Sequence, residues 1–489
     1  MAAPDRSVAK LADALAGRAG VEAVRWVLLG APFRRVVREQ LRRLLSDPDL
    51  LGACRLRRAK FRPGVRLSAW YDVGLCGRRA SAPAPPPRQV MVTWTVAGGD
   101  GGRRAEGPTA AVAAAALDAG LGTPFGALEA ELPGLGMRLL VWPLDPTHPQ
   151  LVRASDPRHV PQMLRAGPAA AGRGPARYGV RAVRYRPGQR HVLRYDPLDL
   201  PDRKGDGRAL FAKLYRPGVG ARAFQVAEFI AAGLASSRGG VSAVRPIAYL
   251  PDDDVVLYPA VVGEPLTRRL GKPDAALGRH LGLAGAALRC LHAVASPTAE
   301  LEMPSFNMER ELCRVLGAGR RLGPIMPGAD ARVAAIVERA AALHERLPRE
   351  GPGLAHGDYK ADHLWIAPRG SGLTLIDFDS ASLAEPALDL GKFLADLQWW
   401  YARRSPQMRL WAQQRFLDGY ADAGGEQSQP LSAHDPPFER LCRARLYEAL
   451  ALTRIAAHRV RIFDRGCASH TEALLERAAA IVTDLEALA

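Results

Sequence analysis

Two short acidic stretches constrain the fold of this chain more than any other feature. The first, AHGDYKADHLW (355–365), holds two histidines, two aspartates and a lysine, and the second, LTLIDFDSA (373–381), follows after a turn that contains glycine. Each stretch adjoins an apolar run with the alternation of a strand. A strand, a turn and a second strand at this spacing predict a hairpin, which would bring Asp358 and Asp377 to one place. The chain must therefore fold so that two carboxylates on loops share a site.

Two carboxylates of this kind suit phosphoryl transfer when a cation for phosphate lies nearby. One can act on an attacking hydroxyl, and the other can bind Mg²⁺. Upstream, the strand-like run ALFAKLYRP (209–217) carries Lys213, and Glu228 lies on the amphipathic run ARAFQVAEFIAAGLA (221–235) that follows. We therefore expect Lys213 to contact phosphate and Glu228 to hold Lys213 in place, because phosphoryl transfer depends on positioning and charge stabilisation.

The domain organisation follows from length and pattern. The chain has 489 residues, which is enough for two or three domains. Residues 166–177 are rich in Gly, Pro and Ala and are the predicted linker. Residues 178–262 read mainly as strands and 263–489 mainly as helices, which predicts an α+β, bilobal plan with the ligand between the lobes. Residues 1–165 form an additional α+β N-terminal domain.

An internal similarity links the two halves. LRRAKFRPGVRLSAWYDV (56–73) and VRAVRYRPGQRHVLRYDP (180–197) share an aromatic-Arg-Pro-Gly turn and a later Tyr-Asp pair. This pattern predicts that residues 1–165 contain a degenerate copy of the strand unit that opens the second half. Chance similarity between two basic hairpins is the alternative.

Composition and charge limit the partners. The formal net charge is +17, but only seven of the 67 basic residues are lysines, and the excess is concentrated in residues 1–90. A solvated basic surface is the preferred interpretation, which disfavours nucleic acid as a partner, and binding of another polyanion is the weaker alternative. The six cysteines show no zinc-type spacing and are expected to be reduced. The absence of a long apolar run predicts a cytoplasmic protein with no membrane partner.

The motifs HGDYKADH and IDFD, with FAKLY, resemble those of the aminoglycoside phosphotransferase and choline kinase family, which has a protein-kinase-like fold. The similarity spans roughly residues 178–463. It implies ATP and Mg²⁺ as cofactors, a small β-rich N-lobe, a large helical C-lobe and a small molecule with a hydroxyl as substrate. Residues 1–165 would resemble the N-terminal cap of maltokinase-like members, either covering the substrate cleft or forming an oligomer surface.

The resemblance assigns roles in the two acidic stretches. Asp358 would orient or deprotonate the acceptor hydroxyl, and Lys360 would touch the transferred phosphate. Asp377 would bind Mg²⁺. Asp389, in EPALDLGKF (385–393), would brace the catalytic loop, although an aspartate at that place would also serve as a helix N-cap.

The resemblance also assigns the nucleotide site. Lys213 would bridge the nucleotide phosphates and pair with Glu228. The connector YPAVVG (258–263) would be the hinge between the lobes. Backbone groups there, including those of Tyr258 and Ala260, would meet adenine.

His363 departs from the family pattern, because a metal-binding asparagine is expected five residues after the catalytic aspartate. An imidazole nitrogen is a softer donor than an amide oxygen, and Mg²⁺ prefers oxygen. His363 therefore either still binds metal, or leaves the metal mainly to Asp377 and water, or impairs binding. Asp379 is a substitute ligand in principle, although strand alternation would point it away from Asp377.

These residues favour an ATP-dependent O-phosphotransferase, with a pseudokinase-like nucleotide-binding regulatory module as the alternative. The acceptor is a sugar, an amino sugar, an aminoglycoside or a related metabolite. Aminoglycosides are polycations and need an acidic pocket, for which the late helices offer Asp396, Asp418, Glu448 and Asp464. The positive net charge of the chain argues against such a substrate.

Overall fold

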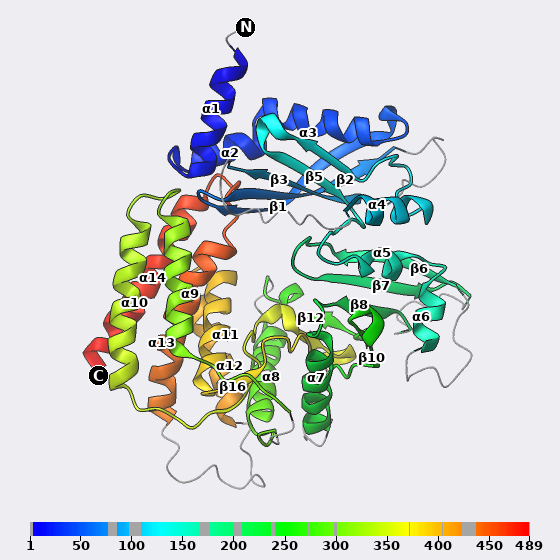
Figure 1. Cartoon of the computed structure of the whole chain (residues 1–489). Helices are drawn as coiled ribbons and strands as arrows, with labels where there is room; N and C mark the ends of the chain where they lie inside the picture. Colours follow the sequence, from blue (N-terminus) through cyan, green and yellow to red (C-terminus); the bar gives the residue numbers. More distant parts are fainter. Residues whose placement is uncertain are drawn as a thin grey trace.

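The computed structural model describes residues 3–76, 86–96, 109–166, 177–199, 208–235, 240–271, 274–297, 301–370, 372–402, 404–422 and 437–488. Most of the expected linker lies outside these residues. The chain forms an N-terminal α+β unit, a second β-rich unit and a large group of helices, at the top, right and left of Figure 1. Within the described part, no helix is long and apolar enough to span a membrane.

The N-terminal unit is an antiparallel sheet with helices on one face. Its elements are α1 (Ala3–Ala16), α2 (Gly20–Leu29), α3 (Ala31–Leu44), β1 (Leu51–Arg62), β2 (Arg66–Leu75), β3 (Arg88–Thr95), α4 (Thr109–Asp118), β4 (Glu129–Leu132) and β5 (Met137–Val141). The strand order is β1-β2-β3-β5-β4. Val24 and Leu41 from the helices pack with Leu67 and Trp94 from the strands in one core, all of them 0 or 1% exposed. Strands β1 and β2 form an antiparallel hairpin around the turn at Pro63 and Gly64.

The second sheet repeats this topology. Its elements are β6 (Tyr178–Arg184), β7 (His191–Pro197), β8 (Leu210–Leu214), α7 (Gly220–Ala235), β10 (Ala248–Leu250) and β11 (Val255–Pro259). Read from β6, the order is β6-β7-β8-β11-β10. Along the chain, α7 lies between β8 and β10, as α4 lies between β3 and β4 in the N-terminal unit. Two antiparallel sheets with the same order and the same helix insertion support the interpretation of residues 1–165 as a degenerate N-lobe copy.

The remaining residues form the large helical lobe. Its helices are α8 (Ala275–His292), α9 (Met308–Leu322), α10 (Ala329–Arg346), α11 (Ala387–Trp400), α12 (Pro406–Asp422), α13 (Pro437–His458) and α14 (Cys467–Leu488). Its strands are β12 (Glu264–Pro265), β13 (Gly353–Ala355), β14 (Leu364–Ile366), β15 (Leu373–Leu375) and β16 (Ser382–Ala384), and β15 also pairs with β9 (Val241–Ala243). A small β-rich lobe beside a helical lobe confirms the predicted bilobal fold, and β14 and β15 form the predicted hairpin.

Two short helices, α5 (Gln150–Ser155) and α6 (Val160–Ala166), belong with the second sheet. Leu151 and Val160 are fully buried in the same core as Tyr195 of β7. Most of the buried apolar residues of these helices belong to the core of the second sheet, although Val152 packs in the core of the N-terminal unit. We therefore propose a domain boundary near residue 145 in place of the expected one at 165.

A buried polar cluster joins the N-terminal unit to the β6–β7 hairpin. The Asp145 carboxylate accepts the Gly188 N–H at 2.9 Å and lies 2.7 Å from His191 Nε2 and 3.0 Å from His148 Nδ1. The three side chains are fully buried. One carboxylate oxygen of Asp145 and one ring nitrogen of each histidine lie within 4.8 Å of one another. Burial acting alone would raise the pKa of Asp145, but hydrogen bonds from the two imidazoles hold it well below its usual value. One charged group therefore fixes the hairpin turn against the N-terminal unit.

We predict that Asp145→Ala lowers the free energy of unfolding by about 3 to 5 kcal/mol, because it leaves two buried imidazoles and a backbone N–H without their partner. Asp13→Ala is the control, since Asp13 forms an exposed ion pair with Arg18. Its removal should cost less than about 1 kcal/mol. Urea unfolding of both variants measures the difference. Equal losses would contradict the structural role of Asp145.

Candidate nucleotide and acceptor site

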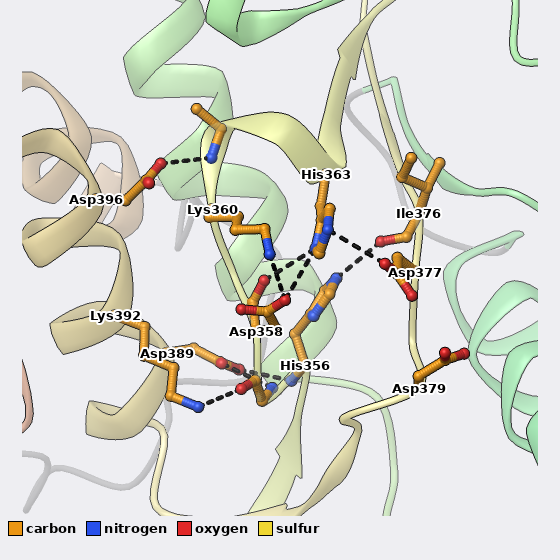
Figure 2. Close-up of polar contacts among 12 residues, drawn as sticks. His356, Asp358, Lys360, His363, Ile376, Asp377, Asp379, Asp389, Lys392 and Asp396 are labelled. Carbon is orange, nitrogen blue, oxygen red and sulfur yellow. Dashed lines mark hydrogen bonds and ion pairs between the residues drawn. The ribbon is translucent and has the colours of Figure 1, made fainter. Parts of the chain in front are cut away.

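The first acidic stretch forms a loop, residues 355–363, which we call the HGD loop (Figure 2). Asp389 in the first turn of α11 holds its beginning: the N–H groups of His356 and Gly357 donate to the two carboxylate oxygens at 2.6 and 2.9 Å. Gly357 has φ of 74°, and a Cβ there would lie 1.9 Å from the Ser380 carbonyl oxygen, so only glycine fits. Asp389 thus braces the loop, as the resemblance implied.

Two further side chains on the same face of α11 hold the rest of the HGD loop. Lys392 and Asp396 follow Asp389 at intervals of three and four residues, which places all three on one helix face. Lys392 donates to the Gly357 carbonyl, and Asp396 accepts the Ala361 N–H at 2.8 Å. Asp396 is 1% exposed. It is therefore a support for the loop and not an acid that faces a substrate.

Two of the other late-helix acids do not form an acidic pocket either. Glu448 is fully buried and accepts hydrogen bonds from Gln398 and Gln413 at 2.7 and 2.8 Å. Asp418 pairs with Arg415 at 2.8 Å on the surface. These positions give no support to a polycationic acceptor.

Asp358 is a partly exposed carboxylate of the HGD loop. Its side chain is 41% exposed, and Lys360 Nζ lies 2.5 Å from its Oδ2. Burial acting alone would raise the pKa of Asp358, but the neighbouring Lys360 and His363 outweigh it and hold the pKa below its usual value. Asp358 is therefore ionised at neutral pH and free to accept a hydrogen bond.

The second acidic stretch turns two carboxylates toward Lys213. Asp377 has φ of 66°, a left-handed conformation that is uncommon for a residue with a side chain. Lys213 Nζ lies 2.7 Å from Asp377 Oδ1 and 2.7 Å from Asp379 Oδ1. Burial favours the uncharged form of Asp377, but Lys213, His363 and Arg190 hold its pKa well below the usual value. Burial lowers the pKa of Lys213 to about 8.

His363 connects the two acidic stretches. Its Nδ1 lies 3.0 Å from the Asp358 carbonyl oxygen, and its Nε2 lies 3.3 Å from Asp377 Oδ2. The side chain is nearly buried, and burial lowers the pKa of His363 to about 3. A neutral imidazole therefore lies where the family pattern has an amide.

The expected pairing of Lys213 with Glu228 is wrong in this structure. Glu228 pairs with Arg245 at 2.9 Å near the protein surface. The helix phase is the reason, because the neighbouring Val226, Ala227 and Ile230 take the buried side of α7. Asp379 supplies the second carboxylate for Lys213 instead.

Asp379 and its partners were not assigned to the nucleotide site from the sequence. The sequence offered Asp379 as a substitute metal ligand, with strand alternation pointing it away from Asp377. Because β15 ends at Leu375, alternation does not extend to Asp379. The Tyr215 hydroxyl donates to Asp379 Oδ1 at 2.7 Å, and Arg190 from the β6–β7 hairpin forms an ion pair with Oδ2. The second aspartate of the DFD motif was the sequence feature that could have indicated this contact.

Tyr258 and Ala260 lie where strand β11 passes into the connector between the lobes. Tyr258 pairs with Phe211 of β8, and its hydroxyl bonds to that of Tyr215. The Ala260 N–H donates to the Ala209 carbonyl at 2.9 Å, which continues the sheet. The expected contact of Ala260 with adenine could therefore not use this N–H without breaking the sheet bond.

A cavity of about 470 Å³ opens beside the HGD loop. Asp358, Lys360 and Asp379 line one side of it, and the start of α9 with the end of α13 lines the other. An accessible carboxylate thus borders a space large enough for a small molecule, next to two carboxylates that bind a lysine.

Comparison with known proteins identifies this part of the chain. Residues 202–436 match the model of the phosphotransferase enzyme family. This part of the chain is similar to that family. A search of curated proteins found no match.

Several solved structures resemble this chain in part. An ethanolamine kinase of Plasmodium vivax aligns with a TM-score of 0.42 and 12% identity, over 62% of this chain and 82% of that one. A choline/ethanolamine kinase family protein of Mesorhizobium loti gives 0.42 and 17%, over 66% and 97%. An aminoglycoside-3'-phosphotransferase of type VIII gives 0.36 and 21%, over 60% and 99%.

We predict that Glu228→Gln leaves ATP affinity within about twofold, because Glu228 binds a surface arginine. Lys213→Met should weaken ATP affinity by about tenfold or more, since a charge-assisted contact to phosphate is lost. Isothermal titration calorimetry with Mg²⁺ and ATP measures both without any acceptor. An equal loss in the two variants would mean that Glu228 reaches Lys213 once the nucleotide is bound.

A second prediction concerns pH. Lys213, with its pKa lowered to about 8, loses its proton as the pH rises through that value, so ATP affinity should fall between pH 7 and 9. The Lys213→Arg variant stays charged and should show a flatter profile. Titrations of both proteins across this range test the point. A fall of the same size in Lys213→Arg would assign the pH dependence to another group.

Proposed function

We propose that the protein is an ATP-dependent O-phosphotransferase that acts on a hydroxyl of a small molecule. One arrangement carries the proposal. The accessible Asp358 carboxylate borders a cavity, and His363 joins its loop to Asp377, which binds Lys213 together with Asp379. These are the parts that phosphoryl transfer needs: a group for the attacking hydroxyl, and charges for the phosphates.

In the proposed reaction, the acceptor oxygen attacks the γ-phosphorus of ATP. The bond from this phosphorus to the β–γ bridging oxygen breaks, and ADP leaves as a phosphate monoester forms. Asp358 orients the hydroxyl and takes its proton as the new bond forms. Lys213 binds the nucleotide phosphates, and Lys360, which lies beside Asp358, neutralises charge on the transferred group.

The residues at Asp377 fit a divalent cation. A neutral imidazole has one N–H, and Nδ1 of His363 faces a carbonyl oxygen that can only accept. The lone pair on Nε2 then faces Asp377 Oδ2 at 3.3 Å, an arrangement that a cation would stabilise. Asp377, His363 and Asp379 would hold Mg²⁺, which supplies charge neutralisation for the triphosphate when it is bound.

The alternative function is a nucleotide-binding regulatory module without turnover. Two observations favour it: His363 replaces the expected oxygen ligand, and Lys213 is already bound by two carboxylates. Turnover separates the two functions, since both bind nucleotide.

We predict that ATP is consumed in the presence of one class among sugars, sugar acids, sugar phosphates, amino sugars, aminoglycosides and amino alcohols. Asp358→Asn should lower this rate by about 10² to 10⁴ because the group that orients the hydroxyl is lost, while ATP affinity is retained. Asp362→Asn is the matched control, because Asp362 is an exposed aspartate in the same loop. Nucleotide binding without turnover on any acceptor would support the regulatory module instead.

A further inference from the structure

One face of the N-terminal sheet is cationic. Arg58, Lys60 and Arg62 alternate along β1, and their cross-strand partners are Trp70, Ser68 and Arg66. Paired residues of an antiparallel sheet share a face, so these side chains lie together, whereas Phe61 between them packs in the core with the helices. The cationic face is therefore the one turned away from α1 to α3.

Strand β1 lies at the edge of its sheet, where it borders a cavity of about 260 Å³ together with Val21 of α2 and the ends of α9, α13 and α14. Arg58 and Lys60 line it from β1, Arg321 from the end of α9 and His458 from the end of α13. Among the described residues that line it, there is no carboxylate. The N-terminal domain and the C-lobe thus bring cations together without an anion between them.

No described carboxylate pairs with these cations, although Arg321 contacts His458 Nε2 at 3.3 Å and Arg58 lies over the Trp70 ring. Lys60, Arg62 and Arg321 form no ion pair with a described carboxylate, and Arg62 Nε is buried without a hydrogen-bond partner. Burial, with repulsion from Arg62, Arg321 and Arg58, lowers the pKa of Lys60 to about 8. Half-buried cations that repel one another reduce the stability of the free protein, which is typical of a site that awaits an anion.

This cavity adjoins the cavity beside the HGD loop. His458 lines both it and the cavity beside the HGD loop. The second cavity is also cationic: six lysines and arginines line it against three carboxylates. Four of the six cations are paired: Arg454 and Arg314 with Glu311, Lys360 with Asp358, and Arg459 with Asp396. Arg310 and Lys392 form no ion pair with a described carboxylate, so the positive charge still exceeds the negative. A molecule that reaches from one cavity into the other would therefore meet mainly positive charge.

We propose that the acceptor carries an anionic group, a phosphate or a carboxylate, which Arg58, Lys60 and Arg321 hold between the N-terminal domain and the C-lobe while its hydroxyl reaches Asp358. This inference rests on the proposed function. Arginine and lysine clusters bind phosphate and carboxylate groups through charge-assisted hydrogen bonds. The N-terminal domain is then a part of the acceptor site, and it selects against the polycationic acceptors.

The test uses the full chain and compares ligands that differ in charge. Glucose 6-phosphate, glucuronate, glucose and glucosamine are titrated against the wild type, Lys60→Gln and Arg55→Gln, with thermal unfolding and calorimetry as readouts. Arg55 lies on the same strand, is exposed and lines neither cavity. Stabilisation by glucose 6-phosphate but not by glucuronate would select phosphate, and the reverse would select carboxylate.

The expected result has two opposite parts. Lys60→Gln should raise the melting temperature of the ligand-free protein, because repulsion is relieved, and should weaken binding of the anionic sugar by about tenfold or more, because a charge-assisted contact is lost. Arg55→Gln should change neither. A merely structural lysine would lower the melting temperature and leave the ligand affinity alone, which would overturn the proposal.

Further arms separate the other sources of anion binding. If Lys213→Met, and not Lys60→Gln, abolishes stabilisation by glucose 6-phosphate, the anion binds in the nucleotide site and the proposal fails. Lys60-dependent binding of a duplex oligonucleotide, with no binding of small anions, would overturn it in favour of a polyanion surface.

ATP consumption distinguishes failure of this inference from failure of the proposed function. Turnover with glucose or glucosamine alone would overturn the anionic acceptor and leave the phosphotransferase intact. Binding of glucose 6-phosphate that depends on Lys60, without turnover on any acceptor, would support the anion site and overturn the proposed function.

Discussion

The rest of the site depends on the hydrogen bonds between side chains of helix α11 and the backbone of the HGD loop. Three charged side chains on one helix face, the buried Asp389 and Asp396 and the partly buried Lys392, bind backbone groups at the beginning and the middle of the loop. Burial acting alone would raise the pKa of Asp389, but the hydrogen bond from His292 and nearby positive charges hold it below its usual value. The loop can therefore expose Asp358 to the cavity while its backbone stays fixed.

Charge balance organises the space around this loop. Asp377 and Asp379 bind the one lysine of the second sheet's strands, and His363 bridges from Asp377 to the HGD loop. Further from Asp358 the balance changes sign, because β1 and the ends of α9 and α13 contribute cations without carboxylates. The two regions suit different partners: a metal-bound nucleotide on one side and an anionic acceptor on the other. The N-terminal domain, which shares the strand order of the N-lobe, supplies the second region.

Local pattern was enough for much of the fold. The Pro-Gly turns at residues 63–64 and 187–188 predict two hairpins, and both are present, at the start of two sheets with the same topology. The proposed domain boundary differs from the expected one at residue 165, because α5 and α6 lie before residue 165 in the sequence but pack mainly on the sheet that follows. A short helix carries no local signal of which sheet will bury its apolar side chains.

The sequence by itself determined which residues are the candidates for the chemistry, because HGDYKADH, IDFD and a rare strand lysine are chemical types at a fixed spacing. It could not determine which of them meet. Glu228 was expected to hold Lys213, yet the phase of α7 turns it toward Arg245, and the left-handed backbone at Asp377 allows Asp379 to take its place. The facing of β1 toward α9 and α13 is likewise a tertiary outcome. Distances between charges far apart in the chain are set by packing of whole elements, and only the folded structure contains them.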